Sequence, residues 1–185
     1  MSRFRLVAIA LLVALCAGFY SCGGGNDETP LNNDDNSNIS NENGNSVIVG
    51  TTAMVQLKKV GALSTLISDN VKFNITDLRI MGDINGDDIA LIREMAGADV
   101  KGNETNGKLA NLNLSNANLV NGGIYYTGIT QEVSSSNELW QYMFYKCGSL
   151  TSIVLPNNIA HIGAFALSYS CLLYTSPSPR DGLLS

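Results

Sequence analysis

Residues 150–166 read LTSIVLPNNIAHIGAFA, and this stretch decides the fold. Its first half places apolar side chains at Leu150, Ile153 and Leu155, an L-x-x-L-x-L spacing that begins the strand of many solenoid repeats. The same spacing occurs in ITDLRI at residues 75–80 and in LANLNL at residues 109–114. Three copies predict stacked parallel strands, because one such strand buries its apolar side only against its neighbours.

The segments between these phrases predict short helices and further strands. We expect a helix over Asp87–Ala96, where Ile89 and Ile92 fall on one face, two acidic residues favour the N-terminus and Gly97 caps the C-terminus. The remaining expected elements are strands at Ala53–Leu57, Asn74–Met81, Leu109–Leu114 and Leu150–Leu155 and short helices at Gly61–Ile67 and Leu139–Tyr145.

Alternating strands and helices favour right-handed crossovers between parallel strands. The fold class that we expect is therefore an α/β solenoid of parallel strands with short helices. The phrases are unevenly spaced, which suits an N-terminal capping region over residues 47–108 followed by about one regular repeat that starts within residues 109–170.

The N-terminus has the features of a secretory signal peptide over residues 1–21. Arg3 and Arg5 precede an apolar run, Leu6–Tyr20, that is too short to span a bilayer comfortably. Cys22 follows at once, and FYSC resembles a bacterial lipobox, which implies lipidation of Cys22 and a mature protein anchored in the outer membrane. The alternatives are a plain signal peptide with an incidental cysteine and an uncleaved anchor. Asp27 and Glu28 resemble an export signal, so we expect surface exposure rather than a periplasm-facing anchor.

Residues 22–46 are rich in Asn, Asp and Gly and poor in apolar side chains. Such a composition cannot bury enough surface to offset the entropy of ordering the chain, so we expect a disordered tether.

The other end of the chain has no periodicity. CLLYTSPSPRD, which opens residues 171–185, resembles the translation of a transposon-type sequencing adapter, so we expect a non-native tail on a truncated gene fragment.

The charge and the cysteine content of the chain narrow the classes of function that it can have. Without signal and tail, eight basic and fifteen acidic residues give a net charge of −7, which disfavours nucleic-acid binding. Of the four cysteines only Cys147 then remains for the folded part, so an intramolecular disulfide is excluded there and we expect a buried structural thiol.

The final segment also resembles a known family. SLTSIVLPNNIAHIGAFA is similar to the leucine-rich repeats of BspA-like surface lipoproteins of Bacteroidetes, and MFYKCGSLTSI is similar to the phrase that enters such a repeat. The GAFA at residues 163–166 departs from the pattern, since the usual spacer before Ala-Phe is missing. The resemblance implies a leucine-rich-repeat fold and a non-catalytic role in adhesion or protein binding, without a cofactor.

Strand alternation indicates which residues would meet a partner. Residues between the apolar positions of each phrase point outwards, and these are Asp77, Arg79, Asn111, Asn113, Ser152 and Val154. We expect the ligand to be a protein or another component of a host or extracellular surface. The rival hypothesis is a glycan-processing surface lipoprotein whose accessory or catalytic domain lies downstream.

Three other groups invite chemical interpretations. Asp83, Asn85, Asp87 and Glu94 have the spacing of a calcium loop, but Asp88 stands where the loop needs Gly, so a turn followed by a helix cap is favoured over the Asp83–Glu94 metal site. His161 is the only histidine, and we expect it to be exposed at an edge. The aromatic segment around residues 125–126 and 140–145 indicates core packing, with a contact patch as the alternative.

Overall fold

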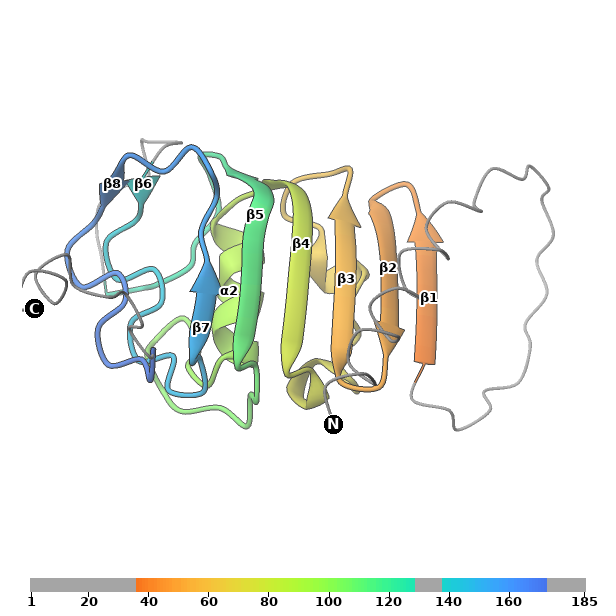
Figure 1. Cartoon of the computed structure of the whole chain (residues 1–185), viewed down its shortest axis with the longest axis horizontal. Coiled ribbons are helices and arrows are strands. Elements are labelled where there is room, and N and C mark those ends of the chain that lie inside the picture. Colours follow the sequence, from red (N-terminus) through yellow and green to blue (C-terminus); the bar gives the residue numbers. More distant parts are fainter. Residues whose placement is uncertain (1–35, 129–137, 173–185) are drawn as a thin grey trace, which may run out of the picture. The chain divides into compact units, whose positions relative to one another are not determined.

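The computed structural model describes residues 36–128 and 138–172, and most of their regular structure is β-strand (Figure 1). An open six-stranded sheet has the order β1-β2-β3-β4-β5-β7, and β6 and β8 form a separate two-stranded sheet. The strands are β1 (Asn36–Asn41), β2 (Gly44–Val49), β3 (Thr52–Leu57), β4 (Asp77–Ile84), β5 (Asn111–Leu119), β6 (Glu138–Leu139), β7 (Ser152–Val154) and β8 (His161–Ile162). The helices are α2 (Gly86–Met95) and two 3-10 turns, η1 (Leu63–Thr65) and η2 (Lys72–Asn74).

The three L-x-x-L-x-L phrases lie on adjacent parallel strands, as predicted. β3, β4, β5 and β7 are parallel neighbours, whereas β1 and β2 add an antiparallel hairpin. Leu78 lies opposite Leu112, which in turn lies opposite Ile153, so equivalent positions of the three phrases form one row across the sheet.

One backbone connection recurs where β4, β5 and β7 begin. The N–H groups of Thr76 and Asp77 both donate to the carbonyl of Thr51, at 2.8 and 3.2 Å. The next strand repeats the arrangement on the carbonyl of Thr76, and β7 repeats it on the carbonyl of Ala110. A shared acceptor fixes the entry point of each strand, and therefore the register of the side chains that follow.

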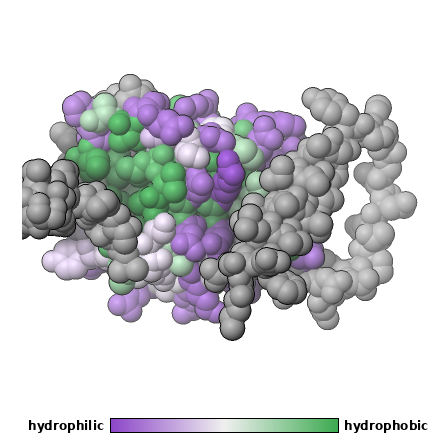
Figure 2. All heavy atoms as spheres, in the orientation of Figure 1, coloured by the Kyte–Doolittle hydropathy of each residue, from purple (hydrophilic) through white to green (hydrophobic). Residues whose placement is uncertain are grey.

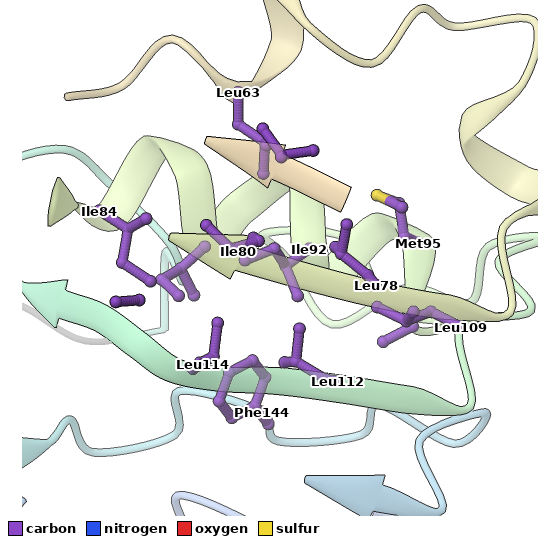
Figure 3. Close-up of a cluster of buried hydrophobic side chains, with 14 of the residues drawn as sticks. Leu63, Leu78, Ile80, Ile84, Ile92, Met95, Leu109, Leu112, Leu114 and Phe144 are labelled. Atoms are coloured by element: carbon purple, nitrogen blue, oxygen red, sulfur yellow. The ribbon is translucent and has the colours of Figure 1, made fainter. Parts of the chain in front are cut away.

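The core lies between the sheet and α2. Figure 3 shows Leu78 and Ile80 from β4 and Leu112 and Leu114 from β5 pointing towards Ile92 of α2. All of these side chains are at most 2% exposed. Alternation along a strand leaves the intervening residues on the opposite side of the sheet, away from α2.

Asp88 joins the N-terminal end of α2 to the loop after β3. Asn85 caps the helix, and the Asp88 carboxylate accepts N–H bonds from Asn85, from Gly61 at 2.8 Å and from Leu63 at 2.9 Å. Burial raises the pKa of the Asp88 carboxyl above its ordinary value, and these three donors oppose the rise. The helix prediction is thus confirmed to within one residue, including a left-handed Gly97 after the last turn.

Arg93 joins the other end of α2 to the segment after β6. Its side chain is fully buried, and Nη1 donates to the carbonyls of Tyr142 and Met143, both at 3.0 Å. Nη2 donates to the carbonyl of Asp99 at 3.1 Å, and the guanidinium lies 5.0 Å from the centre of the Tyr126 ring. Burial lowers the pKa of Arg93, but a guanidinium starts so high that it stays charged.

Two predictions from the sequence are wrong: the disordered tether over all of residues 22–46 and the helix over Leu139–Tyr145. The tether predicted for residues 22–46 ends before Asn36, because β1 and β2 pair along Asn36–Val49 and Ser46 Oγ donates to the carbonyl of Leu66 inside the core. The sheet edge can accept Asn-rich strands because their polar side chains face solvent while backbone pairing supplies the hydrogen bonds. Residues 22–35 lie outside the described part.

The predicted helix at Leu139–Tyr145 does not form. Tyr142 and Lys146 have positive φ values of 59° and 61°, a left-handed conformation that interrupts an α-helix. The N–H groups of Tyr142 and Phe144 donate instead to the carbonyls of Ala164 and Ala166, so this segment pairs with a later one.

The paired segments, Leu139–Lys146 and Ile162–Tyr169, match at an offset of 23 residues. Leu139 lies opposite Ile162 (162 − 139 = 23), and the left-handed Tyr142 and Lys146 recur at the same spacing as left-handed Phe165 and Tyr169. Buried Met143 and Phe144 correspond to Ala166 and Leu167.

Replacing Arg93 by Met should lower the free energy of unfolding by about 2–4 kcal/mol, because three backbone carbonyls lose a charged donor and the buried carbonyl of Met143 is among them. Arg93→Lys should recover part of the loss, since an ammonium keeps the charge but cannot span three acceptors. Urea unfolding of the full chain measures both, with the exposed Lys101→Met as control. Equal midpoints for Arg93→Met and the unmodified chain would contradict the role assigned to Arg93.

Replacing Asp88 by Ala should cost about 3 kcal/mol, because three N–H groups lose an ionic acceptor. The neighbouring Asp87→Ala removes a carboxylate from the same helix turn, yet loses only the bond from Ile124 N–H, so its cost should stay near 1 kcal/mol. Similar losses for the two variants would show that charge near the helix end, rather than the Asp88 hydrogen bonds, is what matters.

Candidate functional site

The six residues predicted to face outwards form two rows across three strands. Asp77, Asn111 and Ser152 pair in one row, and Arg79, Asn113 and Val154 pair in the next. We call the side of β3, β4, β5 and β7 that points away from α2 the outer face. In Figure 1 the outer face is towards the viewer, with α2 behind the sheet.

A β-bulge extends the outer face beyond the predicted residues. The register shifts between Arg79 and Met81, where Ser115 is the additional residue of β5, and Ser115 donates from both N and Oγ to Asn113 Oδ1. After the bulge the outward positions are Asn116, opposite Met81, and Asn118, opposite Asp83. β5 therefore presents four asparagines on the outer face: Asn111, Asn113, Asn116 and Asn118.

The carboxylates of the outer face are already paired with amides and hydroxyls. Asn111 Nδ2 donates to Asp77 Oδ1 at 2.7 Å, and Thr76 Oγ1 donates to the other oxygen at 2.8 Å. Asn118 Nδ2 donates to Asp83 Oδ1 at 3.1 Å. These contacts occupy acceptor positions of both carboxylates and reduce their capacity to bind a further cation.

Arg79 is different, because it keeps unused hydrogen-bonding capacity. Its Nε is buried without a hydrogen-bond partner, and none of the ion pairs found within residues 36–128 and 138–172 involves its guanidinium. It lies between Met54 on β3 and Asn113 on β5. The half-buried guanidinium is thus the one cation among the named residues of the outer face, beside four asparagines and the hydrogen-bonded carboxylates of Asp77 and Asp83.

The residues of the candidate calcium loop do not converge. Asn85 is the helix cap, Asp87 accepts from Ile124 N–H, and Glu94, near the far end of α2, forms an ion pair with Lys72 at 2.9 Å. Within the described part of the chain no group of three acidic, histidine or cysteine residues is arranged to hold a metal ion. The favoured interpretation, a turn followed by a helix cap, is confirmed.

The aromatic segment divides into buried and partly exposed rings. Tyr125 and Trp140 are 3% exposed and pack together, and Tyr125 donates its hydroxyl to the carbonyl of Gln141. Tyr142 stacks on Phe165 with ring centres 5.2 Å apart, which joins equivalent positions of the two paired segments. His161 lies on β8 and is exposed, as predicted.

Cys147 lies in the core, as the sequence predicts for a buried structural thiol. It has no exposed surface, and burial raises the pKa of its thiol to about 12. Because the thiolate is the reactive form, this side chain is inert at neutral pH while the protein stays folded.

Alkylation of the folded full chain with iodoacetamide should modify exposed Cys171 at least 100-fold faster than Cys147, and urea should bring the two rates together. Peptide mass spectrometry reads both sites in one sample, so Cys171 is an internal control. Comparable rates without denaturant would show that the region around Cys147 opens readily.

Cys22, the proposed lipidation site, lies outside the described residues. Among the residues that the structure describes, no helix is long and apolar enough to cross a membrane. Comparison with known proteins leaves the family open, because no protein-family model and no curated protein matches this chain.

Proposed function

We propose that this protein is a non-catalytic surface lipoprotein, anchored through Cys22, with a leucine-rich-repeat solenoid of the BspA-like type. Its outer face would bind a protein partner. The observation that supports this function is the in-register stack of β4, β5 and β7, in which each strand contributes one side chain to each outward row. A regular and largely open array of this kind suits recognition of an extended surface.

The chemistry of the outer face suggests what a partner would present. Arg79 supplies a charge without an ionic partner among the described residues, and it would pair with a carboxylate of the partner. The asparagines of β5 offer donors and acceptors for the partner's backbone and polar side chains. Because Asp77 and Asp83 already accept bonds from asparagines, Arg79 is the outer-face charge left for a partner, and it favours an acidic protein segment there.

The proposal that the protein is non-catalytic rests on the structural roles of its polar and thiol side chains. Asp88 holds the helix start, Asp77 and Asp83 accept bonds from asparagines, and Cys147 is buried. Each of these groups has a structural role that accounts for its position, so no acid–base pair needs to be invoked.

Binding of the full chain to immobilised fibrinogen, collagen and mucin tests the proposal, with starch and xylan as a polysaccharide arm. We expect at least one protein to bind, and Arg79→Glu to weaken that binding tenfold or more, since it reverses the central charge. Tenfold corresponds to about 1.4 kcal/mol of binding free energy. Biolayer interferometry gives the dissociation constants.

Lys101→Glu is the matched control, because it makes the same charge change at an exposed loop residue away from the sheet. It should alter binding less than twofold. Equal affinities for the unmodified chain and Arg79→Glu would contradict the proposed face. Binding confined to starch or xylan would instead favour the glycan-processing hypothesis.

A further inference from the structure

Arg79 carries a partly buried charge that no other described residue compensates. Its Nε is buried without a hydrogen-bond acceptor, and none of the ion pairs within residues 36–128 and 138–172 includes its guanidinium. The buried Nε of Arg93 also lacks an acceptor, but both Nη atoms of Arg93 donate to backbone carbonyls. Buried polar groups almost always have partners, so the unsatisfied guanidinium of Arg79 calls for an explanation.

The neighbours of Arg79 differ on its two sides. Figure 2, in the orientation of Figure 1, shows hydrophilic atoms on the outer face where β4 and β5 lie. Arg79 lies opposite Met54 on β3 and opposite Asn113 on β5. Adjacent strands are about 4.8 Å apart, so the Arg79 and Asn113 side chains can contact the same small group. Met54 offers no acceptor of comparable strength on the other side.

The side chain of Asn113 is held in one orientation by the β-bulge. Asn113 Oδ1 accepts from Ser115 N at 3.0 Å and from Ser115 Oγ at 2.7 Å. Because a backbone N–H only donates, the amide atom that faces it must be the oxygen. Both acceptor positions of Oδ1 are thus used, and Nδ2 keeps two donors that have no acceptor among the residues that the structure describes.

The amides on either side are used differently. Asn111 and Asn118 donate their Nδ2 groups to the carboxylates of Asp77 and Asp83. Asn113 lies opposite a cation instead, so the row of Arg79 and Asn113 presents donors without an acceptor. Because the free protein already bears the cost of partly desolvating the Arg79 charge, an anion that reaches this row gains a stronger attraction than it would at an exposed arginine.

We propose that Arg79 and Asn113 form a carboxylate-binding site, with Ser115 as its positioning residue. One carboxylate oxygen accepts from the Arg79 guanidinium, and the other accepts from Asn113 Nδ2. The site rests on the proposed function and specifies which group of the partner protein meets the outer face: the side chain of an Asp or Glu residue. A carboxamide fits poorly, because its own NH2 group would face these donors. The bulge has the role that bulges often have near functional sites, which is to direct a side chain.

NMR titration of the isotope-labelled full chain with a blocked Gly-Glu-Gly tripeptide tests the site. The signals of Arg79 Nε–H and of the Asn113 side-chain NH2 should shift saturably. The blocked Gly-Gln-Gly tripeptide, at the same ionic strength, should leave both signals in place, since it differs only in having a carboxamide. Backbone amide signals in the same spectra report whether each variant keeps the fold.

Asn113→Asp is the sharpest variant, because it keeps the acceptor for Ser115 yet places a carboxylate of the chain itself opposite Arg79. It should weaken binding of the Glu tripeptide tenfold or more. The matched control, Asn116→Asp, adds the same charge to the same face of β5 but opposite Met81, so the affinity should change less than twofold.

The positioning role of Ser115 has its own test. Ser115→Ala removes the hydroxyl bond to Asn113 and should weaken binding of the Glu tripeptide, whereas Ser115→Thr keeps a hydroxyl and should restore it. Equal affinities for the Ala and Thr variants would remove Ser115 from the site.

Three further results would overturn the site as a whole: no saturable shift with the Glu tripeptide, equal responses to the two tripeptides, or equal affinities for Asn113→Asp and Asn116→Asp. The titration needs no partner protein, so it judges this site alone. Binding to the immobilised proteins judges the proposed function separately.

Discussion

Shared acceptors at the strand entries are the constraint on which the rest of the structure depends. The carbonyls of Thr51, Thr76 and Ala110 each receive two N–H bonds from the next strand, and this fixes where that strand begins. A slip of one residue would turn the row of Leu78, Leu112 and Ile153 out of the core. Both the core rows and the outward rows therefore follow from three repeated backbone contacts.

α2 covers one face of this sheet, and each of its ends is hydrogen-bonded to a different segment of the chain. Asp88 binds backbone N–H groups of the loop after β3, and Arg93 binds backbone carbonyls of the segment after β6. An anion at the start of the helix and a cation near its end also suit the helix dipole. The helix is short, and its two buried ionic side chains connect segments that lie about 25 residues before it and 50 residues after it.

The sequence predicted those parts of the fold that depend on local periodicity. The L-x-x-L-x-L phrases predicted three parallel strands, and the pattern of Asp87–Ala96 predicted the helix, because side-chain spacing alone determines both. The second half of β5 could not be found in this way, since the bulge at Ser115 shifts the alternation by one residue. The hairpin was missed because β1 has a single apolar residue, Ile39, among Asn and Ser, although an Asn-Gly pair lies at its turn.

The candidate site was predictable in part for the same reason. Asp77, Arg79, Asn111 and Asn113 follow from strand alternation, and the structure brings them into adjacent rows. Asn116 and Asn118 were missed because they lie beyond the bulge. The burial of Arg93 gives no sequence signal, because its acceptors at residues 142 and 143 come from a distant segment. The correspondence of Leu139–Lys146 with Ile162–Tyr169 was missed because the two segments share backbone conformation more than residue identity.

The connections between β4, β5 and β7 differ in length. From Asp77 to Asn111 the chain travels 34 residues (111 − 77), and from Asn111 to Ser152 it travels 41 (152 − 111). Neighbouring strands nevertheless stay about 4.8 Å apart, as in any sheet. Insertions and deletions on the far side of the molecule therefore leave the geometry of the outer face intact. Evolution, or an engineer, can lengthen the connections freely while the spacing of the outward rows stays the same.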